Sequence, residues 1–246
     1  MDEWIDGLAD DDSLIQQSNN PVIRYHFVCL MRFASRADAG RQLGQCLRKQ
    51  GVEVDFVLGL PRGGVVVAAE VARLLQRPLD ALIVRKIGHP WHREFAVGAL
   101  AEPDVVILDE ASVGKNPIVR LQLDGIIAEE TARLQAYRSR FHTATAPVLE
   151  GKTVLLVDDG LATGATAEAA VLSAKRQKAR RIIVATPVAS TNAVERLTRV
   201  ADDVVALLVD PDFGAVGQYY DEFEETTDEE VLALLRHQAT SGQSPP

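Results

Sequence analysis

Six short apolar runs between residues 54 and 209 constrain the fold of this 246-residue chain more than any other feature. They are rich in β-branched residues and lack strict alternation with polar residues, which is typical of strands buried on both faces of a parallel sheet. The runs occupy residues 54–60, 79–85, 104–109, 153–159, 181–187 and 203–209. Helical stretches are expected at residues 64–76, 119–140, 164–178 and 190–200. The alternation predicts an α/β fold with a doubly wound, mainly parallel sheet flanked by helices.

The composition fits one large domain, and the two ends of the chain differ from it in sequence character. With 47% hydrophobic and 25% charged residues, the chain can bury a sizeable core. We place a single domain at residues 31–238, because this length suits one α/β unit better than two. Residues 1–30 are acidic and then polar, so we expect a flexible extension, with an ordered strand near residues 23–30 as the alternative. Residues 239–246 are expected to form a disordered tail.

Capping residues mark the expected first and last helices. Ser35 is expected to cap the first helix, with Asp38 at the third helical position and Gly51 as a stop. Near the C-terminus, Thr227 and Glu230 have the spacing of a capping box, which predicts a closing helix at residues 228–237.

The charge and the cysteine spacing exclude several classes of partner. A net charge of −9 gives no general attraction to nucleic acid or anionic lipid, so neither is expected to bind. No run reaches the roughly 18 apolar residues of a membrane span, and the acidic N-terminus is unlike a signal peptide. Cys29 and Cys46 have no spacing typical of a metal site or a disulfide framework. These features predict a cytoplasmic protein.

Residues 153–166, with the sequence TVLLVDDGLATGAT, form the strongest motif. An apolar strand ends in Asp158 and Asp159, and a loop of small residues then leads into a helix. Exposed amides at the start of a helix bind anions, so a phosphate is expected there. Two carboxylates beside a phosphate are best satisfied by vicinal sugar hydroxyls with a divalent cation nearby. The motif therefore predicts a site for a phosphorylated five-carbon sugar.

Other interpretations of this motif fit less well. The two carboxylates could simply cap the helix in a structural turn, but the full string makes this the weaker interpretation. A P-loop would need a lysine, and none stands between Asp158 and Thr166. A dinucleotide fingerprint would need the spacing G-x-G-x-x-G after the first strand, which residues 59–64 do not have.

The string at residues 153–166 resembles the phosphoribosyl-diphosphate motif of the type I phosphoribosyltransferases. The similarity extends over about residues 31–235 and points to a subgroup of predicted phosphoribosyltransferases of unassigned substrate. Its further marks are GLPRGG at residues 59–64, VRKIGHPWHREFAVGAL at residues 84–100 and FGAVGQYYDEF at residues 213–223.

The resemblance implies a role for each motif residue. Asp158 and Asp159 would contact the ribose hydroxyls and a magnesium ion. The residues expected to wrap the 5-phosphate are Ala162, Thr163, Gly164, Ala165 and Thr166. The expected reaction moves the phosphoribosyl group from phosphoribosyl diphosphate to a nitrogenous base or similar nucleophile and releases pyrophosphate. We also expect a homodimer.

Gly63 and Gly64 lie in the second candidate site. The resemblance assigns this loop to the pyrophosphate, held by backbone amides. Independently, the two glycines permit unusual dihedral angles and expose amides at the start of a helix, and Arg62 adds a cation. The alternative is a tight strand-to-helix turn with a surface arginine.

Arg85 and Lys86 follow at the end of the next expected strand. A lysine there can neutralise charge that grows on the leaving pyrophosphate. Because adjacent strand residues point to opposite faces, only one of the two is expected to face the site, and we favour Lys86. A solvated strand end is the alternative.

Residues 88–98 have no clean period and are expected to form a flexible loop that closes over the substrate. His92 and Glu94 are candidate proton carriers within it. His89 and His92 lack an obvious third ligand, so a metal site at this loop is not favoured.

The C-terminal segment is expected to cover the site. By resemblance, residues 210–238 form a small hood, to which the N-terminal helix could contribute. Tyr219 and Tyr220 would then stack on a planar base, with core packing as the alternative.

One position departs from part of the family. Hypoxanthine–guanine transferases carry an aspartate within the motif loop, whereas this chain has Ala162, as adenine-type enzymes do. A proton acceptor would therefore come from the loop or the hood. The alternative function is a non-catalytic regulatory protein that binds phosphoribosyl diphosphate. A serine hydrolase is disfavoured, because no G-x-S-x-G sequence occurs.

Overall fold

A computed structural model gives the structure of the chain. It describes residues 23–25, 32–109, 113, 117–142 and 147–241. Among the helices in these ranges, none is both long and apolar enough to cross a membrane.

A six-stranded sheet forms the centre of the molecule, and every neighbouring pair of strands in it is parallel. In spatial order its strands are β1 (Ile23–Tyr25), β9 (Asp203–Asp210), β8 (Arg181–Ser190), β7 (Thr153–Val157), β2 (Phe56–Gly59) and β3 (Leu79–Ala81). The central strand β7 is buried along its whole length, as its unbroken apolar sequence predicts. The α/β fold with a doubly wound parallel sheet is thus confirmed.

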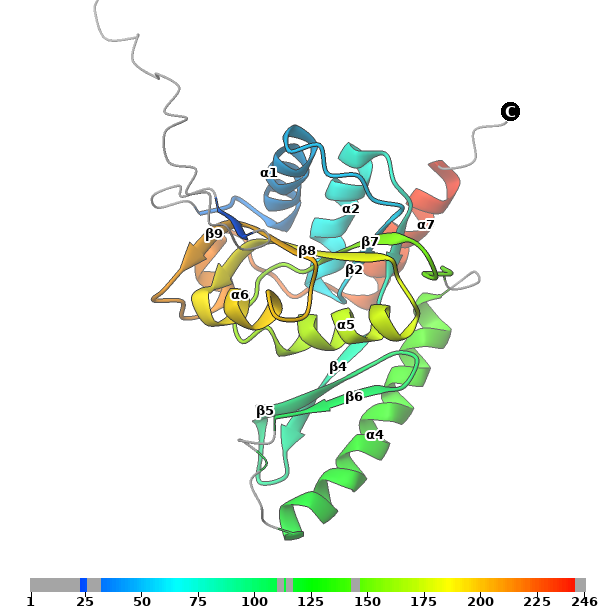
Figure 1. Ribbon diagram of the computed structural model, residues 1–246, viewed down its shortest axis with the longest axis vertical. Coiled ribbons are helices and arrows are strands. Elements are labelled where there is room, and N and C mark those ends of the chain that lie inside the picture. Colours follow the sequence, from blue (N-terminus) through cyan, green and yellow to red (C-terminus); the bar gives the residue numbers. More distant parts are fainter. Residues whose placement is uncertain (1–22, 26–31, 110–112, 114–116, 143–146, 242–246) are drawn as a thin grey trace, which may run out of the picture.

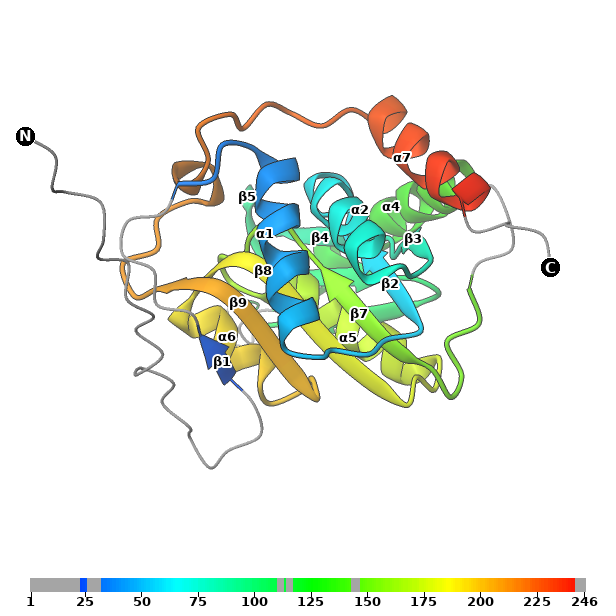
Figure 2. The same cartoon turned by 90° about the horizontal axis from the view of Figure 1, so that it is seen from above.

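Helices cover both faces of this sheet (Figures 1 and 2). On one face lie α1 (Arg36–Lys49) and α2 (Gly63–Leu75), which share an apolar core with the central strands. On the other lie α5 (Ala165–Arg176) and α6 (Thr191–Leu197). The helices α1 and α2 pack so closely that a Cβ on Gly40 would lie 2.7 Å from the Val67 carbonyl oxygen. This close packing fixes the position of α1 over the sheet.

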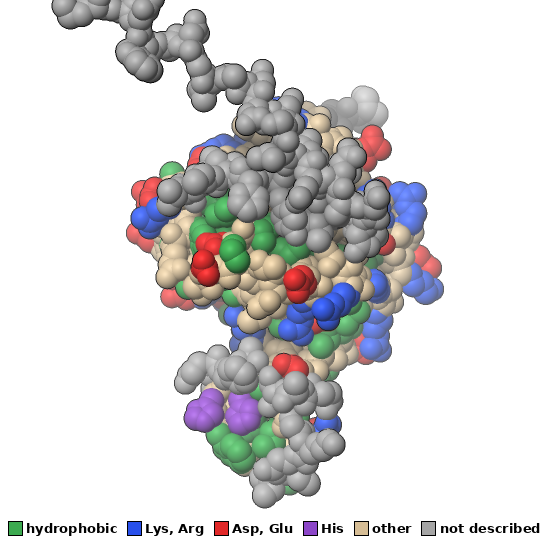
Figure 3. All heavy atoms as spheres, turned by 60° about the vertical axis from the view of Figure 1, so that its left-hand side comes forward, with side chains coloured by type: hydrophobic (Ala, Val, Ile, Leu, Met, Phe, Trp, Pro, Cys, Tyr) green, Lys and Arg blue, Asp and Glu red, His purple; other side chains and the backbone are tan. Residues whose placement is uncertain are grey.

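A second, smaller sheet packs against α5 and projects from the body (Figure 1). Its antiparallel strands are β4 (Val84–His89), β5 (His92–Ala101) and β6 (Val105–Leu108). The long helix α4 (Pro117–Phe141) packs its buried residues Leu123, Ile126 and Leu134 against them. Figure 3 shows this projecting part as a lobe below the body, with histidine side chains at its surface.

Three expectations for this region need correction. Of the run at residues 79–85, only β3 joins the parallel sheet, and the run at residues 104–109 supplies β6 of the smaller sheet. Residues 88–98 are not an irregular loop, because they form most of the β4–β5 hairpin. The sequence of this hairpin looks irregular because the register shifts near Gly88, which interrupts the alternation of side chains along the strand.

The C-terminal part of the chain crosses the helical face. From β9 it passes through the short 3-10 helix η2 (Val216–Tyr219) and runs over the starts of α1 and α2 to α7 (Asp228–Ser241), as Figure 2 shows. We term residues 220–227 the strap. The predicted capping box is present, since the Thr227 amide donates to the Glu230 carboxylate over 2.7 Å and the Glu230 amide donates to the Thr227 hydroxyl over 3.2 Å.

The two ends of the chain differ in part from the expectations. Ile23–Tyr25 form β1 at the edge of the parallel sheet, which is the strand alternative for that stretch of residues 1–30. The remaining residues of that range lie outside the described part. The helix α7 continues to Ser241, so residues 239–241 do not belong to a disordered tail. Residues 242–246 again lie outside the described part.

Candidate functional site

The candidate site lies at the carboxyl ends of two neighbouring strands, β2 and β7. Because they pair in parallel register, with Gly59 opposite Val157, the loops that follow them lie side by side. The Leu60 amide, at the start of one loop, donates to the Val157 carbonyl over 2.9 Å. Ligands of doubly wound sheets bind at such an edge.

Asp158 and Asp159 follow β7 directly. The Asp159 amide donates to an Asp158 carboxylate oxygen over 2.9 Å. Burial raises the pKa of the Asp158 carboxyl well above its ordinary value, and the neighbouring Asp159 charge raises it further. The Asp159 amide and the Lys86 charge act in the opposite direction. The surroundings of Asp158 therefore disfavour its ionised form.

The two glycines of the neighbouring loop pack against this acidic pair. A Cβ on Gly63 would lie 2.0 Å from Asp159 Oδ2, and one on Gly64 would lie 2.9 Å from Asp158 Oδ1. Both residues open the helix α2, and the preceding peptide bond between Pro61 and Arg62 is cis. Any larger side chain at these two positions would displace the carboxylates. The glycines are thus needed for the two loops to meet.

The loop at residues 160–166 is held in place by its backbone. Leu161 pairs with Ala189 of β8, and the Ser190 hydroxyl donates to the Ala162 carbonyl over 2.6 Å. Gly164 has a φ of +72°, and it packs against Ala193. Its positive φ is the reason that glycine is favoured at this position.

The helix α5 begins at Ala165, within this segment, and its N-cap residue Gly164 provides no side-chain cap. Ala162 and Thr163 are exposed, whereas Ala165 and Thr166 are partly buried. The Ala165 amide donates to the Thr163 hydroxyl over 3.4 Å. The amides that follow it in the first turn can meet an anion from solvent, as the motif predicts.

The two adjacent cations of β4, Arg85 and Lys86, have different surroundings. Arg85 turns toward α4, where its Nε lies 2.9 Å from a Glu130 carboxylate oxygen. Lys86 is exposed, and its charge acts on Asp158. Arg85 is thus paired with α4, and the role of Lys86 at the site stays a prediction.

Arg62 faces the strap and the start of α7. Its guanidinium pairs with the Glu225 carboxylate and lies 3.9 Å from Asp228 Oδ1. An anionic ligand at Arg62 would compete with these protein carboxylates.

The predicted proton carriers His92 and Glu94 both belong to β5. His92 opens β5, and its ring stacks on the His89 ring with centroids 5.9 Å apart. Glu94 also belongs to β5, but its side chain lies outside the described part. Among the described residues, no group of three or more potential ligands could hold a metal ion.

The hood tyrosines are buried rather than open to a planar base. Tyr220 packs on Phe33, and its hydroxyl donates to the Asp159 carbonyl over 2.5 Å. Burial and the Asp159 charge raise the pKa of this phenol. The Tyr219 hydroxyl donates to an Asp210 carboxylate oxygen over 2.6 Å. Both tyrosines therefore follow the core-packing alternative, whereas the Phe223 ring is partly exposed, at 38%.

Arg36 is the site residue that sequence reasoning missed. It is the first residue of α1, and its Nε donates to Asp159 Oδ2 over 2.7 Å. Its Nη1 donates to the Glu224 carbonyl over 2.6 Å, so it joins the acidic pair to the strap. The contact joins residues 123 positions apart, and a single sequence carries no spacing signal for such a pair.

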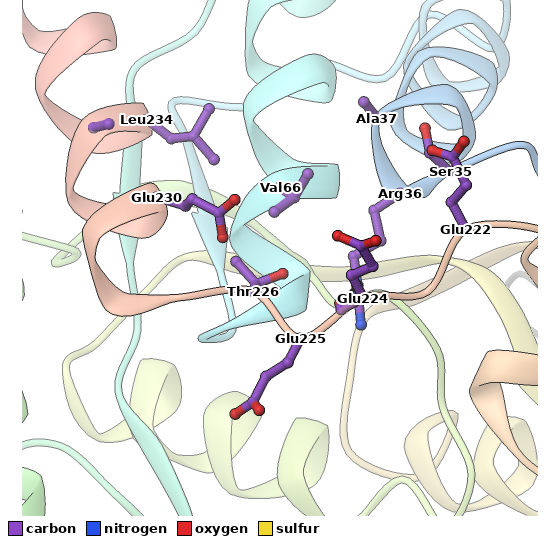
Figure 4. Close-up of a pocket in the computed structure, with 11 residues that line it drawn as sticks. Ser35, Arg36, Ala37, Val66, Glu222, Glu224, Glu225, Thr226, Glu230 and Leu234 are labelled. Atoms are coloured by element: carbon purple, nitrogen blue, oxygen red, sulfur yellow. Dashed lines mark hydrogen bonds between the residues drawn. The ribbon is translucent and has the colours of Figure 1, made fainter.

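A cavity of about 440 Å³ lies beside the site, between α1, α2, α7 and the strap (Figure 4). Its lining includes the apolar residues Val66 and Leu234. The carboxylates around it belong to Glu222, Glu224, Glu225 and Glu230. Arg36 lines this cavity and also reaches Asp159, so it connects the cavity to the acidic pair.

Comparisons with known proteins agree with this geometry. A sequence model of the family described as "Phosphoribosyl transferase domain" matches residues 34–224. Two Mycobacterium tuberculosis proteins, from strains CDC 1551 and H37Rv, are each 42% identical over 204 residues, which is 82% of this chain. Their names assign them provisionally to the phosphoribosyl transferases. The match covers 46% of each of them, so this chain spans about half the length of these relatives.

A solved structure gives the same result for the fold. The crystal structure of TT1426 from Thermus thermophilus superposes with a TM-score of 0.72 at 44% sequence identity. The superposition covers 85% of this chain and 99% of that one.

Proposed function

The chain belongs to the phosphoribosyl transferase domain family, and from this premise we propose that it uses phosphoribosyl diphosphate to phosphoribosylate a nucleophile, with release of pyrophosphate. One observation carries the proposal. The acidic pair after β7, the glycines that open α2 and the start of α5 all meet at one edge of the parallel sheet. A sugar that bears phosphate groups at both ends needs these three features together.

Each part of the ligand has a protein counterpart in this arrangement. Asp158 and Asp159 would accept hydrogen bonds from the ribose hydroxyls, and the start of α5 would bind the 5-phosphate. Gly63 and Gly64 would offer backbone amides to the diphosphate, with Arg62 and Lys86 neutralising its charge. Catalysis would then rest on positioning and on charge neutralisation as the bond to pyrophosphate breaks.

A magnesium ion at this site would be coordinated more by phosphate oxygens of the ligand than by protein atoms. Mg²⁺ prefers oxygen ligands and commonly binds through one or two carboxylates plus substrate phosphates. Asp158 and Asp159 supply such carboxylates, although Arg36 already contacts one oxygen of Asp159. A bound Mg²⁺ would neutralise charge on the diphosphate as it leaves.

The nucleophile would reach the site from the side of the strap and the hairpin. Ala162 provides no proton acceptor within the motif loop, so a nitrogenous base would need one elsewhere or would react without it. His92 and Glu94 remain the proposed carriers, provided that the β4–β5 hairpin moves toward the acidic pair.

Pyrophosphate release tests this function directly. The protein is incubated with phosphoribosyl diphosphate, Mg²⁺ and a panel of bases and amines, and we expect release that depends on one of them. The double variant D158N/D159N should lose this activity. The matched control is D104N, which removes an exposed carboxylate that pairs with Arg176 on α5.

The possible outcomes separate the candidate functions. Tight binding without turnover would favour a regulatory protein that binds phosphoribosyl diphosphate. Absence of binding, or binding that D158N/D159N leaves intact, would defeat the proposal.

A further inference from the structure

Arg36 contacts the acidic pair and the strap with one side chain. Its Nε donates to Asp159 Oδ2 over 2.7 Å, and its Nη1 donates to the Glu224 carbonyl over 2.6 Å. The guanidinium also lies over the Phe223 ring, 3.8 Å from the ring centroid. Only 12% of the Arg36 side chain and 16% of the Asp159 side chain are exposed. The guanidinium is thus held both at its edge and on its face.

The backbone of Arg36 is held rigidly enough to transmit a displacement. The Ser35 side chain caps α1 by accepting from the Asp38 amide, which fixes the first turn. The helix is packed closely on α2 at Gly40, where an added Cβ would lie 2.7 Å from the Val67 carbonyl oxygen. A change at Asp159 is therefore expected to move the guanidinium more readily than the helix α1.

The strap has a second link to the same aspartate. The Tyr220 hydroxyl donates to the Asp159 carbonyl, and the strap backbone pairs with the segment before α1 through the Asp221 amide and the Phe33 carbonyl. From Phe223 onward, the contacts of the strap with the site pass through Arg36, through the Phe223 ring, which packs on Tyr220 with ring centroids 5.1 Å apart, and through the Arg62–Glu225 pair. The latter pair is exposed at Glu225 and contributes little. Arg36 is consequently the side chain that bonds both the middle of the strap and the Asp159 carboxylate.

We propose that Arg36 is a positioning residue that couples ligand binding at Asp159 to the placement of the strap over the site. This inference rests on the proposed role of Asp159 in binding ribose hydroxyls. A ligand hydroxyl that donates to Asp159 shares its carboxylate with Arg36. The guanidinium then changes its contact with Glu224 and Phe223, and the backbone amides of the strap exchange more slowly with solvent.

The planar shape of arginine is required for this coupling. Its fork donates in fixed directions to Asp159 and Glu224 and also stacks on an aromatic ring, whereas lysine is a point charge on a flexible stem. R36K therefore keeps the positive charge beside Asp159 but loses the geometry. R36Q removes the charge as well.

Hydrogen exchange of residues 221–227, together with calorimetric binding of phosphoribosyl diphosphate and Mg²⁺, tests the coupling in the full chain. In the wild type, we expect the ligand to slow exchange in the strap. In R36K, we expect binding to weaken about tenfold, as for the loss of one charge-assisted hydrogen bond, and the ligand-dependent slowing to disappear. R36Q should show faster strap exchange even without ligand.

The matched control is R32Q. Arg32 also contacts the strap, through the Tyr220 carbonyl at 3.1 Å and Asp221 at 3.3 Å, but it is exposed and its contacts do not include Asp159. R32Q should keep the affinity and the ligand-dependent slowing. Thermal unfolding of each variant shows whether it is folded. If R36Q is not folded, the test is made with R36K alone.

The outcomes distinguish this inference from the proposed function. If the wild type binds and R36K keeps both its affinity and the slowing of strap exchange, the coupling is overturned. Equal losses in R32Q would overturn it too, because they would show a general effect of strap contacts. If the wild type does not bind at all, the proposed function fails, and the coupling that rests on it fails with it.

Discussion

Two adjacent carboxylates with different surroundings define the site at the scale of single residues. Asp159 is paired with Arg36, whereas the pKa of Asp158 is raised by burial and by the charge of its neighbour. A raised carboxyl pKa means that the ionised side chain destabilises the folded state at neutral pH. In the proposed function, a ligand that donates hydrogen bonds to Asp158 would offset this cost.

D158N is expected to stabilise the ligand-free protein. Because the folded-state pKa of Asp158 is raised, the carboxylate costs stability above that pKa, and the cost disappears as protonation of the folded state sets in at lower pH. The gain should be about 1 kcal/mol at pH 8 and smaller at pH 4.5. Urea unfolding at both pH values measures it, with D104N as the exposed control. A loss of stability at pH 8 would contradict this account of the site.

G63A is expected to weaken ligand binding without unfolding the protein. The added methyl group would overlap Asp159 Oδ2, so the acidic pair or the start of α2 must move. Affinity for phosphoribosyl diphosphate should fall at least about tenfold, which corresponds to roughly 1.4 kcal/mol. The control is G125A, since a Cβ on Gly125 in α4 meets no atom within 4 Å. Unchanged affinity in G63A, measured by calorimetry, would show that the two loops do not form one site.

At the scale of elements, a buried ionic cluster joins β3, the loop after β5 and the end of α4. The Glu102 carboxylate accepts from the Ile83 amide over 2.8 Å and lies 3.0 Å from His142 Nε2 and 2.8 Å from Arg138 Nε. His142 Nδ1 lies 3.4 Å from Asp80 Oδ1. The cluster therefore attaches the projecting sheet and α4 to the edge of the parallel sheet.

This cluster makes stability depend on pH. Hydrogen bonds to Asp80 and Glu102 raise the pKa of His142 to about 9. Since the folded-state pKa is raised, the stabilisation is fully present below about pH 6.5 and is lost as the pH rises through 9. H142Q should lower the free energy of unfolding by up to about 3 kcal/mol at pH 6 and much less at pH 10. Equal destabilisation at both pH values, in denaturant titrations, would refute an electrostatic origin.

The elements also show where sequence reasoning succeeds and where it stops. The central strand β7, the helix after it and both helix caps were predictable, because burial on both faces and capping leave local signals at Ser35 and Thr227. The β4–β5 hairpin was not, because its register shift near Gly88 hides the alternation of a strand. The pairing of Arg36 with Asp159 depends on tertiary structure alone.

At the scale of the whole molecule, an acidic chain of net charge −9 would have to hold the strongly anionic ligand that we propose. Positive charge would be supplied locally, because Arg62 lies at the start of α2 and Lys86 acts on the acidic pair from the projecting sheet. Helix starts add backbone amides at the same edge. The site therefore depends on three elements that the fold brings together, and the homodimer stays a prediction.

The most direct test of this account compares phosphoribosyl diphosphate with its two halves. Calorimetry with Mg²⁺ measures the binding of the whole ligand, of ribose 5-phosphate and of pyrophosphate to the full chain. If the loops after β2 and β7 form one site, the whole ligand should bind at one equivalent per chain, more tightly than either half. No binding, or equal affinity for the whole ligand and ribose 5-phosphate, would contradict the account.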